Sequence, residues 1–288
     1  MTRLHALVAA ELSEPVDARV AAMAAAIAAE YPGAARAVLF YGSCLRQRAL
    51  EGLMLDFYLI VSDYRAAYGR GWLALANRLV PPNVFPFEHA GLAAKYAVLS
   101  EADFARLTGP EAGDVSVWAR FAQPSRLAWA ADEGARARAV DAVARAAPTL
   151  LGHALPMTDG DDLLDVWRKG FALTYASELR AERHGRPESI VDDDPERYRR
   201  FAAAALPLTR PQAGAAKKWR RFRRRGKALT LIRLAKATTT YAGGVDYLAW
   251  KINRHAGTRI EVRPWQRRWP ILGALVLLPR LLKRGAIR

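Results

Sequence analysis

Two apolar runs separated by a short polar connection point to a sheet-forming chain. Residues 37–41 (Ala-Val-Leu-Phe-Tyr) and 53–61 (Leu-Met-Leu-Asp-Phe-Tyr-Leu-Ile-Val) are rich in β-branched and aromatic side chains, which predicts buried strands. A third strand is expected at residues 92–99. Helical patterns are expected at residues 15–30 and 64–79, and Ser100 followed by Asp103 resembles a capping box opening another helix. This alternation predicts an α/β sheet domain over residues 1–131.

The middle of the chain, residues 132–209, is expected to form a mainly helical domain. Helices are predicted at residues 132–147 (closed by Pro148), 161–182 and 198–206, with a polar loop at 183–195. Residues 207–216 are the best candidate for a linker because they are rich in proline and small residues.

The positive charge of the chain is concentrated in residues 210–288. This region holds 21 Lys or Arg against two acids, whereas the rest holds 23 bases and 26 acids, within a formal net charge of +16. We therefore expect a near-neutral globular body with a C-terminal region that binds a polyanion.

Composition narrows the setting and the chemistry. A single cysteine excludes a disulfide framework and a four-cysteine zinc site, and the five histidines show no metal-ligand spacing. No apolar stretch is long enough for a spanning helix, and no secretion signal is evident. A reducing, cytoplasmic setting is expected.

The front domain carries a candidate phosphate site. Gly42 and Ser43 follow one expected strand and Asp56 lies in the next, with twelve residues between Ser43 and Asp56. Gly42 lets backbone N–H groups approach a triphosphate, Ser43 offers a hydroxyl, and Asp56 can hold Mg²⁺. This is the layout of nucleotidyltransferase-fold enzymes, although Tyr58 stands where a second acid is common. An aspartate inside a strand can equally be a satisfied buried polar group.

Five segments, in order, resemble the mitochondrial translocator assembly and maintenance type of phosphatidate cytidylyltransferase, a peripheral CDP-diacylglycerol synthase with bacterial relatives. They cover most of the chain: Tyr41-Gly-Ser43, Met54-Leu-Asp-Phe57, Lys95-Tyr-Ala-Val-Leu-Ser100, Trp118-Ala-Arg-Phe-Ala-Gln-Pro124, and Lys236 to Gly243 with Val245-Asp-Tyr247 and Lys251. Cys44 and Ala97 replace glycines of the family pattern. Its glycine- and tyrosine-rich segment is represented only by residues 81–87.

The resemblance implies a reaction, a fold and a set of site residues. A phosphatidate oxygen attacks the α-phosphorus of CTP to give CDP-diacylglycerol, a precursor in phospholipid and cardiolipin synthesis, and pyrophosphate leaves. The implied fold is a nucleotidyltransferase-type mixed sheet, a winged-helix-like middle domain and a basic amphipathic tail. The implied roles are metal binding and catalysis for Asp56, catalysis for Lys95, and substrate binding for Tyr41, Gly42, Ser43, Tyr96, Arg120, Lys236 and Lys251.

The C-terminal region combines bases with apolar residues. Residues 217–227 hold eight bases in eleven positions, with Trp219 and Phe222 between them. Residues 271–278 form a short apolar run, which is too short to span a bilayer and is flanked by tryptophans and arginines. A nucleic acid would account for the bases alone, whereas an anionic membrane surface accounts for both features. The expected location is the inner face of the cell membrane, and no nucleic acid is required.

Two alternatives to this function stay open. The first alternative is a nucleotidyltransferase that acts on another acceptor. The second is a non-catalytic membrane or nucleic-acid binder built on a decayed transferase. The candidates for a second metal ligand are Asp63, Glu88 and the substrate itself. The sequence does not define the oligomeric state.

Overall fold

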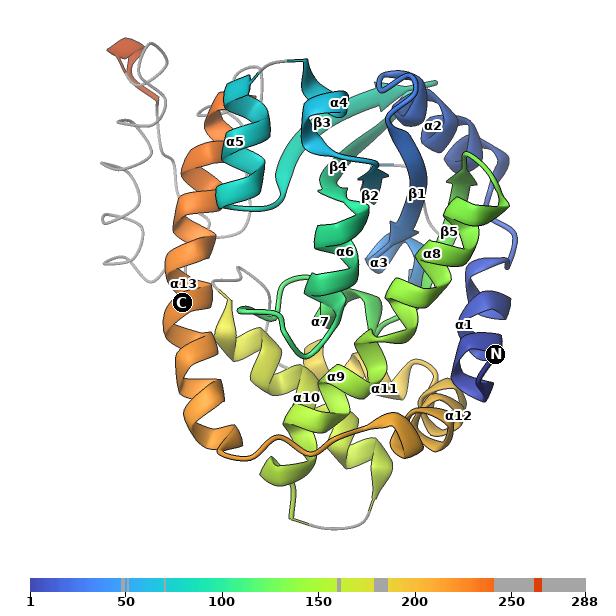
Figure 1. Ribbon diagram of the computed structural model, residues 1–288, viewed down its shortest axis with the longest axis vertical. Coiled ribbons are helices and arrows are strands. Elements are labelled where there is room, and N and C mark those ends of the chain that lie inside the picture. The colour runs from blue at the N-terminus through green and yellow to red at the C-terminus, as the bar shows by residue number, and fades with distance from the viewer. Residues whose placement is uncertain are drawn as a thin grey trace.

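A computed structural model describes residues 1–47, 50, 52–69, 71–159, 162–178, 186–240 and 262–265. It is a mixed α/β structure built on one five-stranded sheet with the order β3-β4-β2-β1-β5 (Figure 1). The strands are β1 (Ala35–Tyr41), β2 (Met54–Val61), β3 (Asn83–His89), β4 (Leu92–Ser100) and β5 (Ser125–Ala130). Only the β2–β4 pair is parallel, and the other neighbours are antiparallel.

Helices precede, interrupt and follow the strands. The first half contains α1 (Arg3–Leu12), α2 (Ala18–Ala29), α3 (Ser43–Gln47), α4 (Tyr64–Tyr68), α5 (Gly71–Leu79), α6 (Glu101–Thr108) and α7 (Trp118–Phe121). The second half contains α8 (Glu133–Ala144), α9 (Ala146–Ala154), η1 (Leu155–Met157), α10 (Leu163–Ser177), α11 (Arg186–Asp192), α12 (Pro195–Ala205), η2 (Leu206–Leu208) and α13 (Ala215–Thr240).

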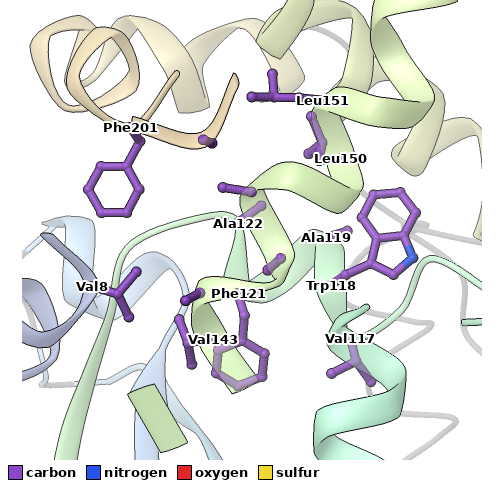
Figure 2. Packing of buried hydrophobic residues seen from close by; sticks show 14 of the residues in the cluster. Val8, Val117, Trp118, Ala119, Phe121, Ala122, Val143, Leu150, Leu151 and Phe201 are labelled. Atoms are coloured by element: carbon purple, nitrogen blue, oxygen red, sulfur yellow. The ribbon is translucent and has the colours of Figure 1, made fainter. Parts of the chain in front are cut away.

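Strand periodicity divides the sheet into two faces. Val38, Phe57 and Val98 point to one face, where they pack with α2. Leu39, Ile60, Leu99 and their neighbours point to the other, which α1, α6, α7 and α8 cover. Figure 2 shows Trp118 and Phe121 of α7 among side chains of α1, α9 and α12 on this second face. Because one cluster of buried side chains runs from Leu4 to Phe222, the helices beyond the sheet share its core.

A buried ion pair connects α1 to α12, far apart in sequence. The Arg197 guanidinium donates to both carboxylate oxygens of Glu11, at 2.5 Å from Nε and 2.9 Å from Nη2. Arg197 also donates to the carbonyl oxygen of Ala122 and stacks on the Phe201 ring. These contacts satisfy the hydrogen-bonding groups of the buried pair. Removing one partner would leave the other as a buried charge without a counterion.

Helix α13 closes the core beside Trp118. Trp219 and Phe222 are buried, and the Trp219 indole Nε1 donates to the carbonyl oxygen of His153 at 2.9 Å. Their rings pack against Trp118 and His153, so the aromatic residues among the bases serve the core, while the bases face solvent. A side chain at Gly226 would collide with the carbonyl oxygen of Ser177, which explains a glycine within this helix.

Most of the expected elements are present, with specific differences. Helix α1 and strands β3 and β5 are additional, and the helix expected at 64–79 is split after the left-handed Gly69 into α4 and α5. Pro148 does not close α8 but lies in the first turn of α9. A proline is tolerated there because the N–H that it lacks would have no partner within the helix. The loop expected at 183–195 contains α11.

The finer parts of the predicted architecture have mixed outcomes. The described residues from 133 to 208 form helices without a strand, so the winged-helix detail is not confirmed. The boundaries at 131/132 and 209/210 stay predictions. Among the described helices, none combines the length and apolar character that a bilayer crossing requires.

Candidate active site

Asp56 and Lys95 form an ion pair on adjacent strands. Asp56 pairs in register with Lys95 of β4 and, on its other side, with Tyr41 at the end of β1. The Lys95 ammonium Nζ lies 2.9 Å from Asp56 Oδ1, and both side chains are partly exposed (32% and 20%). The pair is therefore accessible to a ligand while fixed by the sheet register.

Gly42 brings the backbone of β1 up to the second carboxylate oxygen. A Cβ at Gly42 would lie 3.1 Å from Asp56 Oδ2, and the φ of Gly42, +97°, is one that favours glycine. Ser43 follows at the start of α3 and is half-buried. The sequence-predicted Tyr41, Gly42, Ser43, Asp56 and Lys95 thus meet at one end of the β1–β2–β4 ladder.

Tyr58 lies two residues after Asp56 in β2 and therefore on the same face of the sheet. Its ring packs 5.3 Å from that of Tyr41 and 5.2 Å from that of Phe121. Burial first, and then the Asp56 charge, raises the pKa of the Tyr41 phenol well above its usual value, so Tyr41 is neutral here. A core aromatic therefore occupies the position at which nucleotidyltransferase-fold enzymes commonly carry a second acid.

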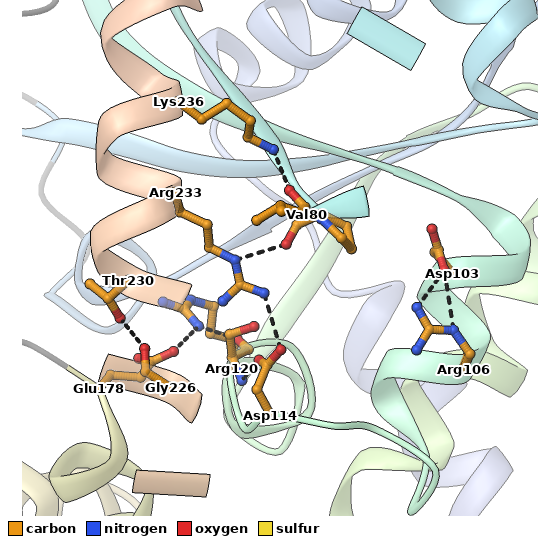
Figure 3. Close-up of polar contacts among 12 residues, drawn as sticks. Val80, Asp103, Arg106, Asp114, Arg120, Glu178, Gly226, Thr230, Arg233 and Lys236 are labelled. Atoms are coloured by element: carbon orange, nitrogen blue, oxygen red, sulfur yellow. Dashed lines mark hydrogen bonds and ion pairs between the residues drawn. The ribbon is translucent and has the colours of Figure 1, made fainter. Parts of the chain in front are cut away.

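Arg120 lies beside this aromatic group and is held by protein partners. Its Nη1 is 3.3 Å from Glu178 Oε1, and it also donates to the carbonyl oxygen of Ser116 (Figure 3). Burial opposes its charge, but Glu178 and the neighbouring tyrosines outweigh that effect and raise its pKa. Arg120 is thus cationic beside the site and balanced by Glu178, a partner that sequence inspection missed.

Two side chains of helix α13 bind the turn between α5 and β3. Arg233 Nε donates to the carbonyl oxygen of Pro81 at 2.8 Å, and its Nη2 lies 3.1 Å from Asp114 Oδ2. Lys236 Nζ donates to the carbonyl oxygen of Val80 (Figure 3). Lys236, expected to bind substrate, therefore has a structural contact in this conformation. Arg233 and Asp114 had no sequence motif to reveal them.

Of the two remaining expected site residues, the structure places Tyr96 away from this pair. Tyr96 points to the opposite face of the sheet from its neighbour Lys95, and its hydroxyl is 3.1 Å from that of Tyr31. The structure thus separates Tyr96 from the Asp56–Lys95 pair. Lys251 lies outside the described residues.

The oxygen donors at this site are few. Among the described residues, no group of three or more His, Cys, Asp or Glu could hold a metal ion. Asp63 caps α4 with its carboxylate, beyond the far end of β2, and Glu88 is exposed on the edge strand β3. One carboxylate fits a Mg²⁺ ion that arrives on nucleotide phosphates, since Mg²⁺ commonly combines one or two carboxylates with phosphate and water.

Comparisons with known proteins give little further information. No protein-family model matches the sequence, and no curated protein matches it. Among solved structures, the chain is similar to a nucleotidyltransferase-like protein from Exiguobacterium sibiricum, at 12% sequence identity. The alignment covers 92% of this chain and 91% of that one, with a TM-score of 0.29. At this TM-score the similarity carries no argument about fold or function.

Proposed function

We propose that the protein is a nucleotidyltransferase that transfers CMP from CTP to phosphatidic acid at a membrane surface. One observation carries the proposal. The Asp56 carboxylate, paired with Lys95, lies directly against the left-handed Gly42 and beside Ser43. A carboxylate, a cation and an open backbone turn in one place are what a metal-bound triphosphate requires.

In the proposed reaction a phosphatidate oxygen forms a bond to the α-phosphorus of CTP. The bond from that phosphorus to the bridging oxygen breaks, and pyrophosphate takes the electron pair. The attacking phosphate is already anionic near neutral pH, so the site needs to supply orientation and charge compensation, without a general base.

The residues of the site divide this work. The Gly42–Ser43 turn receives the triphosphate, and Lys95 shifts from Asp56 to a phosphate oxygen when the nucleotide binds. Asp56 would hold Mg²⁺, which when bound supplies positive charge next to the leaving pyrophosphate. Arg120, balanced by Glu178, adds a fixed cation beside Tyr41. Direct substrate contacts by Lys236 and Lys251 stay predictions.

The C-terminal region would keep the enzyme at its insoluble substrate. Exposed bases along α13, among them Arg220, Arg223 and Lys227, support attraction to an anionic bilayer, while Trp219 and Phe222 are committed to the core. These bases support our proposal that the protein acts on the inner face of the cell membrane.

The test combines Mg²⁺, labelled CTP and vesicles that contain phosphatidic acid. The wild type should produce a labelled lipid. Asp56→Asn should lower turnover at least about a hundredfold, because a neutral amide neither holds Mg²⁺ nor balances Lys95. Asp63→Asn is the matched control, since asparagine also caps α4, and it should retain turnover. Equal loss in both variants, or none in Asp56→Asn, would contradict the proposal.

A non-catalytic membrane or nucleic-acid binder is the second candidate, favoured by Tyr58. This buried aromatic occupies the place of a second acid, and the described residues supply no substitute carboxylate cluster. Such a binder would bind vesicles or nucleic acid equally well in the wild type and in Asp56→Asn, and would yield no labelled product with any acceptor. A transferase for another acceptor would label that acceptor and leave the lipid unlabelled.

A further inference from the structure

Helix α5 exposes a stripe of large apolar side chains. Trp72, Leu75 and Leu79 are 52%, 56% and 70% exposed, and their spacing places them on one side of the helix. The opposite side anchors the helix, because Asn77 is fully buried and its Nδ2 donates to the carbonyl oxygen of Val98 at 2.9 Å. The stripe therefore faces outward on a helix that is fixed to the sheet.

Helix α13 extends this surface. Arg233 and Lys236 bind the carbonyl oxygens of Pro81 and Val80, directly after α5, so the two helices are held at the same turn. Ile232, one turn before Lys236, is 49% exposed. Figure 1 shows α5 beside the upper part of α13. We call Trp72, Leu75, Leu79 and Ile232 the apolar patch.

The two helices that carry the apolar patch are cationic. Neither α5 nor α13 contains an acidic residue. Arg78 is exposed beside Leu79, and Arg221 and Arg225 are exposed on the side of α13 that leads to Ile232, at helical spacings from it. The charge on these helices therefore favours a partner that is both apolar and anionic.

This charge disfavours two occupants. A second copy of the chain would place the same cations opposite each other, and these like charges would repel. The chain's own apolar run at 271–278 is flanked by Arg268 and Arg280 and so carries the same sign of charge. An anionic bilayer satisfies both requirements, because tryptophan and leucine enter the interfacial region while arginines contact phosphate headgroups.

We propose that the apolar patch docks on an anionic lipid bilayer and forms a membrane contact separate from the C-terminal residues 264–282. This contact extends the proposed function but needs no transfer activity. Its tests use vesicles of phosphatidylcholine and phosphatidylglycerol, without CTP or phosphatidate, so the contact and the enzymatic proposal can fail independently.

The first test reports on the patch itself. An environment-sensitive fluorophore is attached to Leu75→Cys in a Cys44→Ser background, and to Leu208→Cys as the matched control. Leu208 is a comparably exposed leucine (45%) in η2, outside the patch. Anionic vesicles should shift the emission at position 75 to the blue and leave position 208 unchanged. No shift at position 75, or an equal shift at both positions, overturns the proposal.

The second test measures affinity in the full chain. Trp72→Ala combined with Leu79→Ala should weaken binding to anionic vesicles by about tenfold or more, because two large side chains lose their apolar contact. Leu208→Ala should bind as the wild type does. Unchanged binding by the double variant overturns the proposal, as does equal binding to vesicles of phosphatidylcholine alone.

Discussion

At the scale of single residues, the close approach of the Gly42 backbone to Asp56 Oδ2 predicts that alanine is not tolerated at position 42. Gly42→Ala introduces a Cβ at 3.1 Å from this oxygen and forces a left-handed backbone on alanine. We expect a loss of about 1–2 kcal/mol of stability from the backbone alone, together with a loss of turnover as the carboxylate moves. Urea denaturation and the transfer assay measure the two effects.

Gly33→Ala separates these contributions. Gly33 also has a positive φ, +72°, but a Cβ there meets nothing within 4 Å. It should lose similar stability and keep full turnover. If Gly33→Ala lost turnover as well, the effect at Gly42 could not be assigned to its contact with Asp56.

The candidate site was only partly predictable from single residues. Gly42, Ser43 and Asp56 are recognisable because strand ends and a glycine turn leave a local pattern. The Asp56–Lys95 contact depends on the register of two strands far apart in sequence. Tyr96 was assigned with its neighbour Lys95, yet alternation along a strand sends adjacent side chains to opposite faces. Arg120 binds Glu178, whose position no local pattern reveals.

At the scale of elements, the contact of α13 with the α5–β3 turn should make stability depend on pH. Burial, and then the Arg233 charge, lowers the pKa of Lys236 to about 7. An unfolded lysine titrates at about pH 10.4, so protonation favours the unfolded chain. This cost is absent above that pH, grows as the pH falls toward 7, and is constant at lower pH.

Comparing Lys236→Met with the wild type tests this effect. From about pH 10 down to about pH 7, the wild type should lose stability relative to the variant, as measured by urea unfolding. Lys217→Met changes an exposed lysine of the same helix and serves as the control. The same pH slope in both variants would show that the effect does not come from Lys236.

Strand predictions succeeded where apolar residues predominate over the whole strand. Strands β1, β2 and β4 are of this kind, with Asp56 and Lys95 as charged exceptions, and were placed to within about two residues. Strand β3 contains Pro86 and is mostly half-exposed, and β5 is short and only partly buried, so neither has a clear period-two pattern. Both lie at the edges of the sheet, where a strand has one neighbour and propensity carries less weight.

At the scale of the whole molecule, α13 completes the core on which the preceding helices depend. Truncation after Thr209 removes Trp219 and Phe222 and exposes Trp118 and the ring of His153. We expect the truncated chain to lose cooperative thermal unfolding and to aggregate.

Point variants show whether packing is the cause. Trp219→Ala should cost about 3–5 kcal/mol, because it empties a buried site, whereas Arg223→Ala, on the exposed side of α13, should cost less than about 0.5 kcal/mol. Circular dichroism melts and urea unfolding report both. A truncated chain that melts as sharply as the full chain would show that residues 1–209 are self-sufficient.

The placement of Trp219 and Phe222 has a consequence for biosynthesis. A chain emerging from the ribosome can pair β1 with β2 early, but Trp118 and His153 gain these two partners only after α13 has been made. Translation at about 5–20 residues per second leaves this aromatic surface uncovered for several seconds. We therefore expect the nascent protein to present a site for chaperones during that interval, and slower translation across α13 to increase aggregation.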